Sequence, residues 1–164
     1  MKQYTGIQYS TTGTFGYSFR DSDTEQFNIS YLILPDLDIT LSGFHKKLWH
    51  RNFDGQITLC PGVRRNIVDE SGNVQGYYEY AEINEFHIMT EGTAARAKVK
   101  VSEVGWQVFI GADLIAEILR LPECERKRFE ENGFDMELQF QVNISEKTTP
   151  SLYPYIMAVP ILGF

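Results

Sequence analysis

The sequence predicts a mainly β protein, either an antiparallel β-barrel or a β-sandwich, with one helical segment near residues 113–131. Apolar and polar residues alternate along several segments, and turn-forming residues separate these segments from one another. The aromatic content of 13% points the same way, because aromatic rings pack well on the pleated face of a sheet. Regular alternation also favours antiparallel pairing, with one face of the sheet buried and the other in water.

Strands are expected along most of the chain. The N-terminal stretch 4–20 carries Thr, Tyr and Phe among glycines and is expected to form one or two strands. The clearest alternation lies in 95–101 and 136–145, where every second residue is apolar. Further strands are expected at 27–34, 56–59, 64–68, 75–80, 85–89 and 106–110, and residues 69–73 (Asp-Glu-Ser-Gly-Asn) are expected to form a hairpin turn.

The helical expectation rests on the segment that follows Gly111. Asp113 can cap a helix whose apolar residues recur at helical spacing, namely Leu114, Ile115, Ile118 and Leu119. Pro122 can begin a second helical piece, which Gly133 would end. The apolar segment 153–164 contains two prolines and is instead expected to form a buried closing strand or an extended tail.

Length and charge restrict the class of protein. The 164 residues fit one domain, 1–164, without repeats or linkers. A net charge of −7 argues against a surface adapted as a whole to nucleic acid. No apolar run reaches the length of a transmembrane helix and no secretory signal is visible, so a cytoplasmic location is expected. There Cys60 and Cys124 would be reduced, although their pairing is left open.

One segment combines basic and aromatic residues in a way that suits a phosphate-bearing ligand. Guanidinium and ammonium groups bind phosphate, and a tryptophan can insert its ring at a membrane interface. The same residues would also serve as a solvated edge that discourages strand pairing between molecules. The candidate residues are His45, Lys46, Lys47, Trp49, His50 and Arg51, together with Arg64 and Arg65.

A second positive row is formed by Arg96, Lys98 and Lys100, which would share one face of their strand. Glutamates on neighbouring strands are expected to neutralise this row, because opposite charges pair across a sheet. No nucleophile motif, phosphate loop, dinucleotide fingerprint or metal-ligand spacing is present. Neither a cofactor nor a metal is therefore expected, and catalysis has no support from the sequence.

Three segments of the chain are distinctive together: the hairpin 67–74, the stretch Gly105–Val108 and the apolar finish 155–162. Through these segments, residues 56–164 resemble the tubby C-terminal, LURP-one and scramblase-like group. The resemblance implies a closed antiparallel barrel around a central hydrophobic helix and, in some members, phosphoinositide binding through basic residues. That central helix is C-terminal in the group, whereas the helical pattern here lies at 113–131.

Three functions follow as hypotheses. The first is a non-catalytic binding domain that recognises an anionic ligand, such as a lipid headgroup or membrane surface, through the basic-aromatic cluster. The second is an assembly protein, a homo-oligomer or a subunit of a larger particle, held together by the apolar tail. The third is a small-molecule binder or enzyme with a pocket inside the sheet, which would require inward-facing polar side chains.

Overall fold

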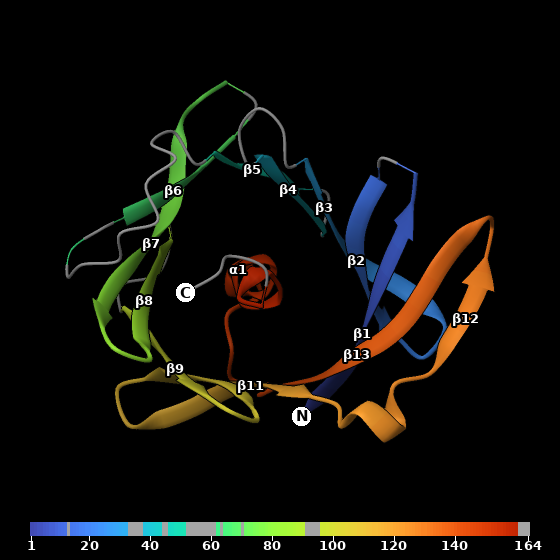
Figure 1. Ribbon diagram of the computed structural model, residues 1–164. Helices are drawn as coiled ribbons and strands as arrows, with labels where there is room; N and C mark the ends of the chain where they lie inside the picture. Colours follow the sequence, from blue (N-terminus) through green and yellow to red (C-terminus); the bar gives the residue numbers. More distant parts are fainter. Residues whose placement is uncertain are drawn as a thin grey trace.

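The strands of the protein belong to one antiparallel sheet, which curves around a short C-terminal helix in the computed structural model (Figure 1). The structure describes residues 1–12, 14–32, 38–43, 46–51, 62, 64–69, 71–90 and 96–160. For residues 14, 31–32, 38–43 and 46–51 it describes the backbone alone. The strands are β1 (Lys2–Thr11), β2 (Thr14–Asp21), β3 (Thr24–Leu32), β4 (Asp38–Gly43), β5 (Lys46–Arg51), β6 (Arg64–Val68), β7 (Val74–Glu82), β8 (Glu85–Thr90), β9 (Ala97–Ser102), β10 (Gly105–Ile110), β11 (Asp113–Arg120), β12 (Arg128–Glu131) and β13 (Phe134–Ile144).

Each strand from β1 to β10 pairs with the next one along the chain, and β11 pairs with β13 instead of β12. The long strand β13 pairs with three others: β11 and β1 along its C-terminal half, and β12 and β1 along its N-terminal half. Asp69 and residues 71–73 lie in the expected turn, in which the Asp69 carboxylate accepts hydrogen bonds of 2.9 Å from the backbone N–H groups of Ser71 and Asn73. The mainly β, antiparallel prediction is confirmed.

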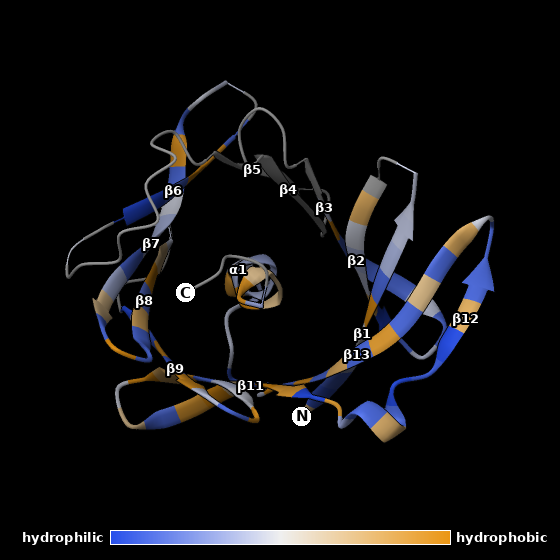
Figure 2. Cartoon of the chain, viewed as in Figure 1, coloured by the Kyte–Doolittle hydropathy of each residue, from blue (hydrophilic) through white to orange (hydrophobic). Residues whose placement is uncertain are grey.

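Alternation places the core on the side of the sheet that faces the helix. In β13, the inward residues Phe140, Val142 and Ile144 are buried, and in β9 Ala97 and Val99 are buried while the lysines between them are exposed. Figure 2 shows the corresponding bands of hydrophilic and hydrophobic colour along β13. The sequence pattern therefore assigns the inner face of these residues correctly, but not that of Met136: the β1–β13 register shifts beyond Phe140, and Met136 lies outside the main core.

The sheet curves around α1 (Tyr153–Ala158), which follows a 3₁₀ turn, η2 (Pro150–Leu152). Every residue of α1 is buried. Tyr153 packs edge-on against Tyr4 of β1 and at a tilt against Phe27 of β3, and Tyr155 packs against Tyr78 of β7. A helix of six residues is too short to be stable alone, so contacts with the surrounding strands hold it in place.

The expectation for the tail was wrong in conformation, because residues 153–158 form a helix instead of a strand or extended tail. Pro154 lies in the first helical turn. Backbone N–H groups there make no hydrogen bond within the helix, so the absence of an N–H on proline has no cost. The expected burial is correct. Residues 161–164 lie outside the described part of the chain.

The helix expected at 113–131 was also wrong. Residues 113–120 form β11 between β10 and β13, residues 123–125 form the 3₁₀ turn η1, and residues 128–131 form β12. A β-bulge opposite Val108 and Phe109 leaves Ile115 and Ala116 buried in succession, with Ile118 buried two residues later. The bulge therefore gives buried residues at 115, 116 and 118. Apolar residues three apart are also typical of a helix, and this explains the misassignment.

No helix in the described ranges is both long and apolar enough to cross a membrane.

Candidate functional site

The predicted basic-aromatic cluster is divided between β5 and β6, which lie side by side. β5 carries residues 46–51 and pairs with β6 at Trp49–Val68 and His50–Ile67. The structure describes only the backbone of β5, and His45 lies outside the described residues. The strand that carries most of this cluster thus adjoins the strand that carries Arg64 and Arg65.

Arg64 and Arg65 occupy opposite faces of β6. Arg64 is exposed on the outer face, where its guanidinium lies over the Tyr77 ring at 4.3 Å and its Nε donates a 2.6 Å hydrogen bond to Glu79. Arg65 stands opposite the fully buried Tyr78, and burial lowers the pKa of its guanidinium. Arg64 alone of this pair therefore belongs to an outer binding surface.

A row of charged residues crosses the outer face of four strands. The strand register places Arg64 opposite Glu79, Glu79 opposite His87, and His87 opposite Lys98. Glu79 accepts hydrogen bonds from two arginines at once, Arg64 at 2.6 Å and Arg96 at 3.2 Å. One carboxylate therefore accepts hydrogen bonds from two guanidinium groups.

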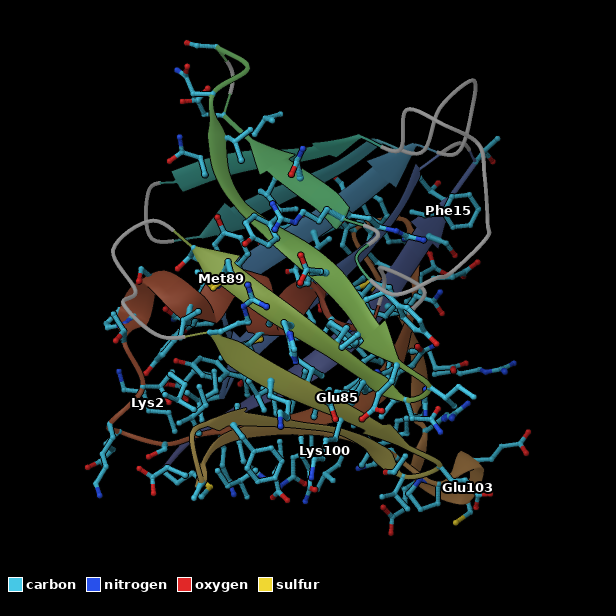
Figure 3. All side chains as sticks on the ribbon, turned by 90° about the vertical axis from the view of Figure 1, so that its left-hand side faces the viewer. Lys2, Phe15, Glu85, Met89, Lys100 and Glu103 are labelled. Carbon is cyan, nitrogen blue, oxygen red and sulfur yellow. The ribbon has the colours of Figure 1, made fainter. Side chains whose placement is uncertain are left out.

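Glu85 has a similar role on the neighbouring strand β8. Its Oε1 lies 3.4 Å from His87 Nε2 and 3.7 Å from Lys98 Nζ. It also stands opposite Lys100 across the β8–β9 pair, as Figure 3 shows for the two labelled side chains. The Lys100 ammonium lies 5.4 Å from the centre of the Phe109 ring. The prediction that glutamates pair with the row Arg96, Lys98 and Lys100 is therefore confirmed for Arg96 and Lys98.

The cationic side chains of this row are more exposed than the carboxylates, and this makes the outer surface positively charged. The Arg64, Arg96 and Lys98 side chains are 51%, 46% and 46% exposed, whereas those of Glu79 and Glu85 are 14% and 17% exposed. The cations stand outermost and cover the carboxylates beneath them. We call the outer side of β6–β9 around Arg64, Arg96, Lys98 and Lys100 the basic face.

The electrostatics of Glu79 agree with this arrangement. The hydrogen bond from Arg64 is the largest cause that lowers the pKa of Glu79, and the charges of Arg64, Arg96 and His87 lower it further. The same hydrogen bond raises the pKa of Arg64. Glu79 is thus held ionised and oriented by its neighbours, so it fixes the positions of two guanidinium groups.

A second candidate site also lies outside the sheet but away from β6–β9, where the β12–β13 hairpin approaches the outer face of β1–β3 (Figure 1). We call this site the hairpin cleft. It has a volume of about 330 Å³ and is lined by Tyr9, Ser18, Arg20, Glu25, Asn28, Glu131, Asn132, Phe134 and Met136.

A small apolar cluster holds the hairpin in place. Ile7 and Met136 are buried, although they do not belong to the main core. Tyr9 and Phe134 meet edge-to-face, with their ring centres 5.5 Å apart. Aromatic pairs in this geometry stabilise contacts by about 0.5–1.5 kcal/mol beyond the area that they bury.

Polar groups of the hairpin cleft form one connected network. Arg20 donates from both terminal nitrogens to the Glu131 carboxylate at 3.1 Å, and its Nε donates to Ser18 Oγ at 3.2 Å. Glu25 Oε2 accepts from the buried Ser18 at 2.5 Å and from Asn28 at 3.3 Å. The network thus links β2 and β3 to the tip of the hairpin.

Tyr9 completes the network by reaching across β2. Its hydroxyl donates a 2.7 Å hydrogen bond to Asn28 Oδ1 on β3. The strand between them carries Gly16 opposite Tyr9, and a Cβ at Gly16 would collide with the Tyr9 hydroxyl and with the backbone oxygen of Ile29. Only glycine leaves room for the ring at this position.

Sequence reasoning missed the hairpin cleft, although a signal for its hairpin was present. Asn132 and Gly133 adopt positive φ angles of 52° and 81° in the two-residue turn between the paired residues Glu131 and Phe134. Asn-Gly between two strands is the strongest short-range signal for a hairpin. Gly133 was instead interpreted as the end of a helix.

Within the described residues, no group of three or more His, Cys, Asp or Glu side chains could hold a metal ion. Cys124 is exposed, and Cys60 lies outside the described part of the chain. Comparison with protein-family models, with curated proteins and with solved structures found no match.

Proposed function

We propose that this protein is a non-catalytic binding domain that recognises a phosphate-bearing anionic ligand through the basic face. The observation that carries the proposal is the layering of charge on β6–β9: exposed cations lie over largely covered carboxylates. Ion pairs within this face leave positive groups in contact with water, where an incoming anion would meet them first.

The charge count of this face supports the same proposal. The cations Arg64, Arg96 and Lys98 pair with the two carboxylates of Glu79 and Glu85, and Lys100 stands opposite Glu85. Among these arginine, lysine and glutamate side chains, four positive and two negative charges leave a positive balance in a chain whose net charge is −7. A local patch of this kind attracts anions over roughly 8–10 Å at physiological salt.

The neighbouring strand β5 would extend the basic face. It pairs with β6 through its backbone and carries Lys46, Lys47 and Arg51, and the proposal extends to these residues together with His45, Trp49 and His50. Arginine and lysine bind phosphate by charge-assisted hydrogen bonds, each worth about 1.5–3 kcal/mol. Several such contacts would be needed for measurable affinity.

The relationship to the tubby C-terminal, LURP-one and scramblase-like group belongs to the proposal as well. The departure expected from the sequence, a helix at 113–131, is absent, and a buried C-terminal helix lies inside the antiparallel sheet. The pairing of β13 with both β1 and β11 would also suit the barrel of that group. These features support the relationship.

Two other functions have less support. The apolar tail was the basis for an assembly protein, but residues 153–159 are buried against the protein's own strands. A pocket inside the sheet was the basis for a small-molecule binder, yet α1 occupies that space with apolar side chains. We therefore favour a protein that binds its ligand on the outer surface of the sheet.

Titration with two phosphate sources tests the proposed function. The first is vesicles of phosphatidylcholine containing phosphatidylglycerol, with pure phosphatidylcholine as the neutral reference; the second is soluble inositol hexakisphosphate. We expect binding to the anionic probes that weakens as salt rises. Binding to both probes would indicate that phosphate suffices, and binding to vesicles alone would indicate a membrane surface.

Matched charge variants locate the binding surface. Arg96→Gln with Lys98→Gln removes two exposed cations from the basic face, and Lys46→Ala, Lys47→Ala and Arg51→Ala together remove three from β5. Lys127→Gln with Lys147→Gln removes two cations elsewhere and serves as the control. We expect at least about tenfold weaker binding in the first two variants. Equal loss in the control, or no binding by wild type, would refute the proposal.

A further inference from the structure

The hairpin cleft contains hydrogen-bond acceptors that the described residues leave open. Glu25 Oε2 is occupied by Ser18 and Asn28, while its Oε1 accepts no hydrogen bond from the described residues. The Tyr9 hydroxyl gives its proton to Asn28, so its oxygen lone pairs remain available to accept. A ligand suited to these groups must bring donors.

Charge in the cleft points in the same direction. Two carboxylates, Glu25 and Glu131, face one cation, Arg20, so the lining carries a net charge of about −1. Arg20 already donates to both oxygens of Glu131 in a bidentate pair. The Glu131 carboxylate therefore already balances the charge of Arg20, whereas a cation can approach Glu25 without breaking that pair.

The remaining walls suit an alkyl chain. Phe134 and Met136 contribute apolar surface, and the Tyr9 ring stands edge-on to Phe134. The face of a tyrosine ring also attracts an ammonium or guanidinium group within about 6 Å of its centre. A volume of about 330 Å³ has room for a chain of several methylene groups with a charged head.

We propose that the hairpin cleft binds an alkylguanidinium or alkylammonium group, with the charged head on Glu25 and the methylene groups against Tyr9, Phe134 and Met136. Such a group occurs both in small free amines and in the arginine and lysine side chains of a protein partner. The site lies on strands β1–β3 and β12–β13, and it is independent of the basic face on β6–β9.

The first experiment compares charged and neutral probes of the same shape. Butylguanidine is titrated against butylurea, and a five-residue Gly-Gly-Arg-Gly-Gly peptide is titrated against its citrulline counterpart, with backbone amide chemical shifts as the readout. We expect the guanidinium probes to bind about 10- to 100-fold more tightly than their neutral partners. The shifted amides should belong to β1–β3 and to the β12–β13 turn.

The pattern of binding identifies the source of the ligand. Saturation by butylguanidine would indicate that a small molecule suffices, and saturation by the arginine peptide alone would indicate a protein side chain. The proposal would be overturned if neither guanidinium probe saturates, if each neutral probe binds as well as its charged partner, or if the shifted amides lie elsewhere.

A variant pair separates the site from the overall charge. Glu25→Gln keeps an acceptor for Ser18 but removes the charge, whereas Glu103→Gln removes the same charge from the exposed β9–β10 turn. We expect about tenfold weaker guanidinium binding in Glu25→Gln and less than about twofold change in Glu103→Gln. Equal effects would refute the site. If Glu25→Gln fails to fold, the comparison of charged with neutral probes on wild type still decides the outcome.

Discussion

Tyr78 of β7 donates a 2.7 Å hydrogen bond to the backbone oxygen of Tyr155 in α1. The last four carbonyl groups of a helix have no partner within it, and that of Tyr155 is one of these four because α1 ends at Ala158. Tyr78 is fully buried, and burial raises the pKa of its hydroxyl far above the ordinary value. The hydroxyl is therefore a neutral donor that joins the sheet to the central helix.

Tyr78→Phe should destabilise the protein by about 1–3 kcal/mol, because it removes a buried hydrogen bond between the sheet and the helix. Urea unfolding followed by circular dichroism measures the change. Tyr77→Phe, which removes a hydroxyl from the neighbouring residue on the outer face, should change the free energy of unfolding by less than about 0.5 kcal/mol. Similar values for the two variants would contradict a special role for the Tyr78 bond.

Ile118→Ala and Leu114→Ala should differ strongly in stability, although both residues lie on the same stripe of the expected helix. Ile118 is fully buried in β11, whereas Leu114 is 40% exposed. We expect Ile118→Ala to cost about 2–5 kcal/mol and Leu114→Ala less than about 1 kcal/mol. Equal costs in thermal or urea unfolding would favour a helix over the strand.

Glu131→Gln should make the protein less stable near neutral pH, and the difference from wild type should vanish in acid. The hydrogen bond and charge of Arg20 lower the pKa of Glu131 in the folded state. Its contribution is therefore complete above the ordinary glutamate value of about 4.3 and is lost as the pH falls through the lower folded value. Melting temperatures of both proteins between about pH 7 and pH 3 measure this convergence. A difference that persists in acid would show another cause.

Gly16→Ala should displace Tyr9 from the hairpin cleft, because the added Cβ collides with its hydroxyl and with the Ile29 oxygen. We expect a loss of about 1–3 kcal/mol in unfolding experiments, together with changed amide shifts at Asn28. In a Tyr9→Ala background the same substitution should cost less, since one of the two collisions is gone. Simple additivity of the two substitutions would contradict this packing.

Strands were predictable where one face is buried and the other is exposed to solvent. The segments expected at 64–68, 75–80, 85–89 and 106–110 correspond to β6, β7, β8 and β10 within two residues at each end. The hairpin turn at 69–73 was predictable as well, because Asp69 bonds locally to its own loop. Local hydrogen bonding and period-two burial need no information from distant residues. The strand expected at 56–59 lies outside the described residues.

The candidate sites were only partly predictable. The sequence indicated that cations would meet glutamates on neighbouring strands, but not that Glu79 would serve Arg64 and Arg96 together. The hairpin cleft depends on Arg20 and Glu131, which are 111 residues apart in the chain. Such a contact requires the register of β1, β2 and β13, and no local pattern encodes it.

By itself the sequence determined the class of the fold and the buried face of most of its strands, because alternation of apolar and polar residues is a local pattern. Only the tertiary structure decided that residues 113–120 form a strand and that residues 153–158 form a helix at the centre. The reason is physical: β11 obtains its hydrogen bonds from β10 and β13, and the short α1 obtains its stability from the strands that surround it. Both depend on partners that are far away along the chain.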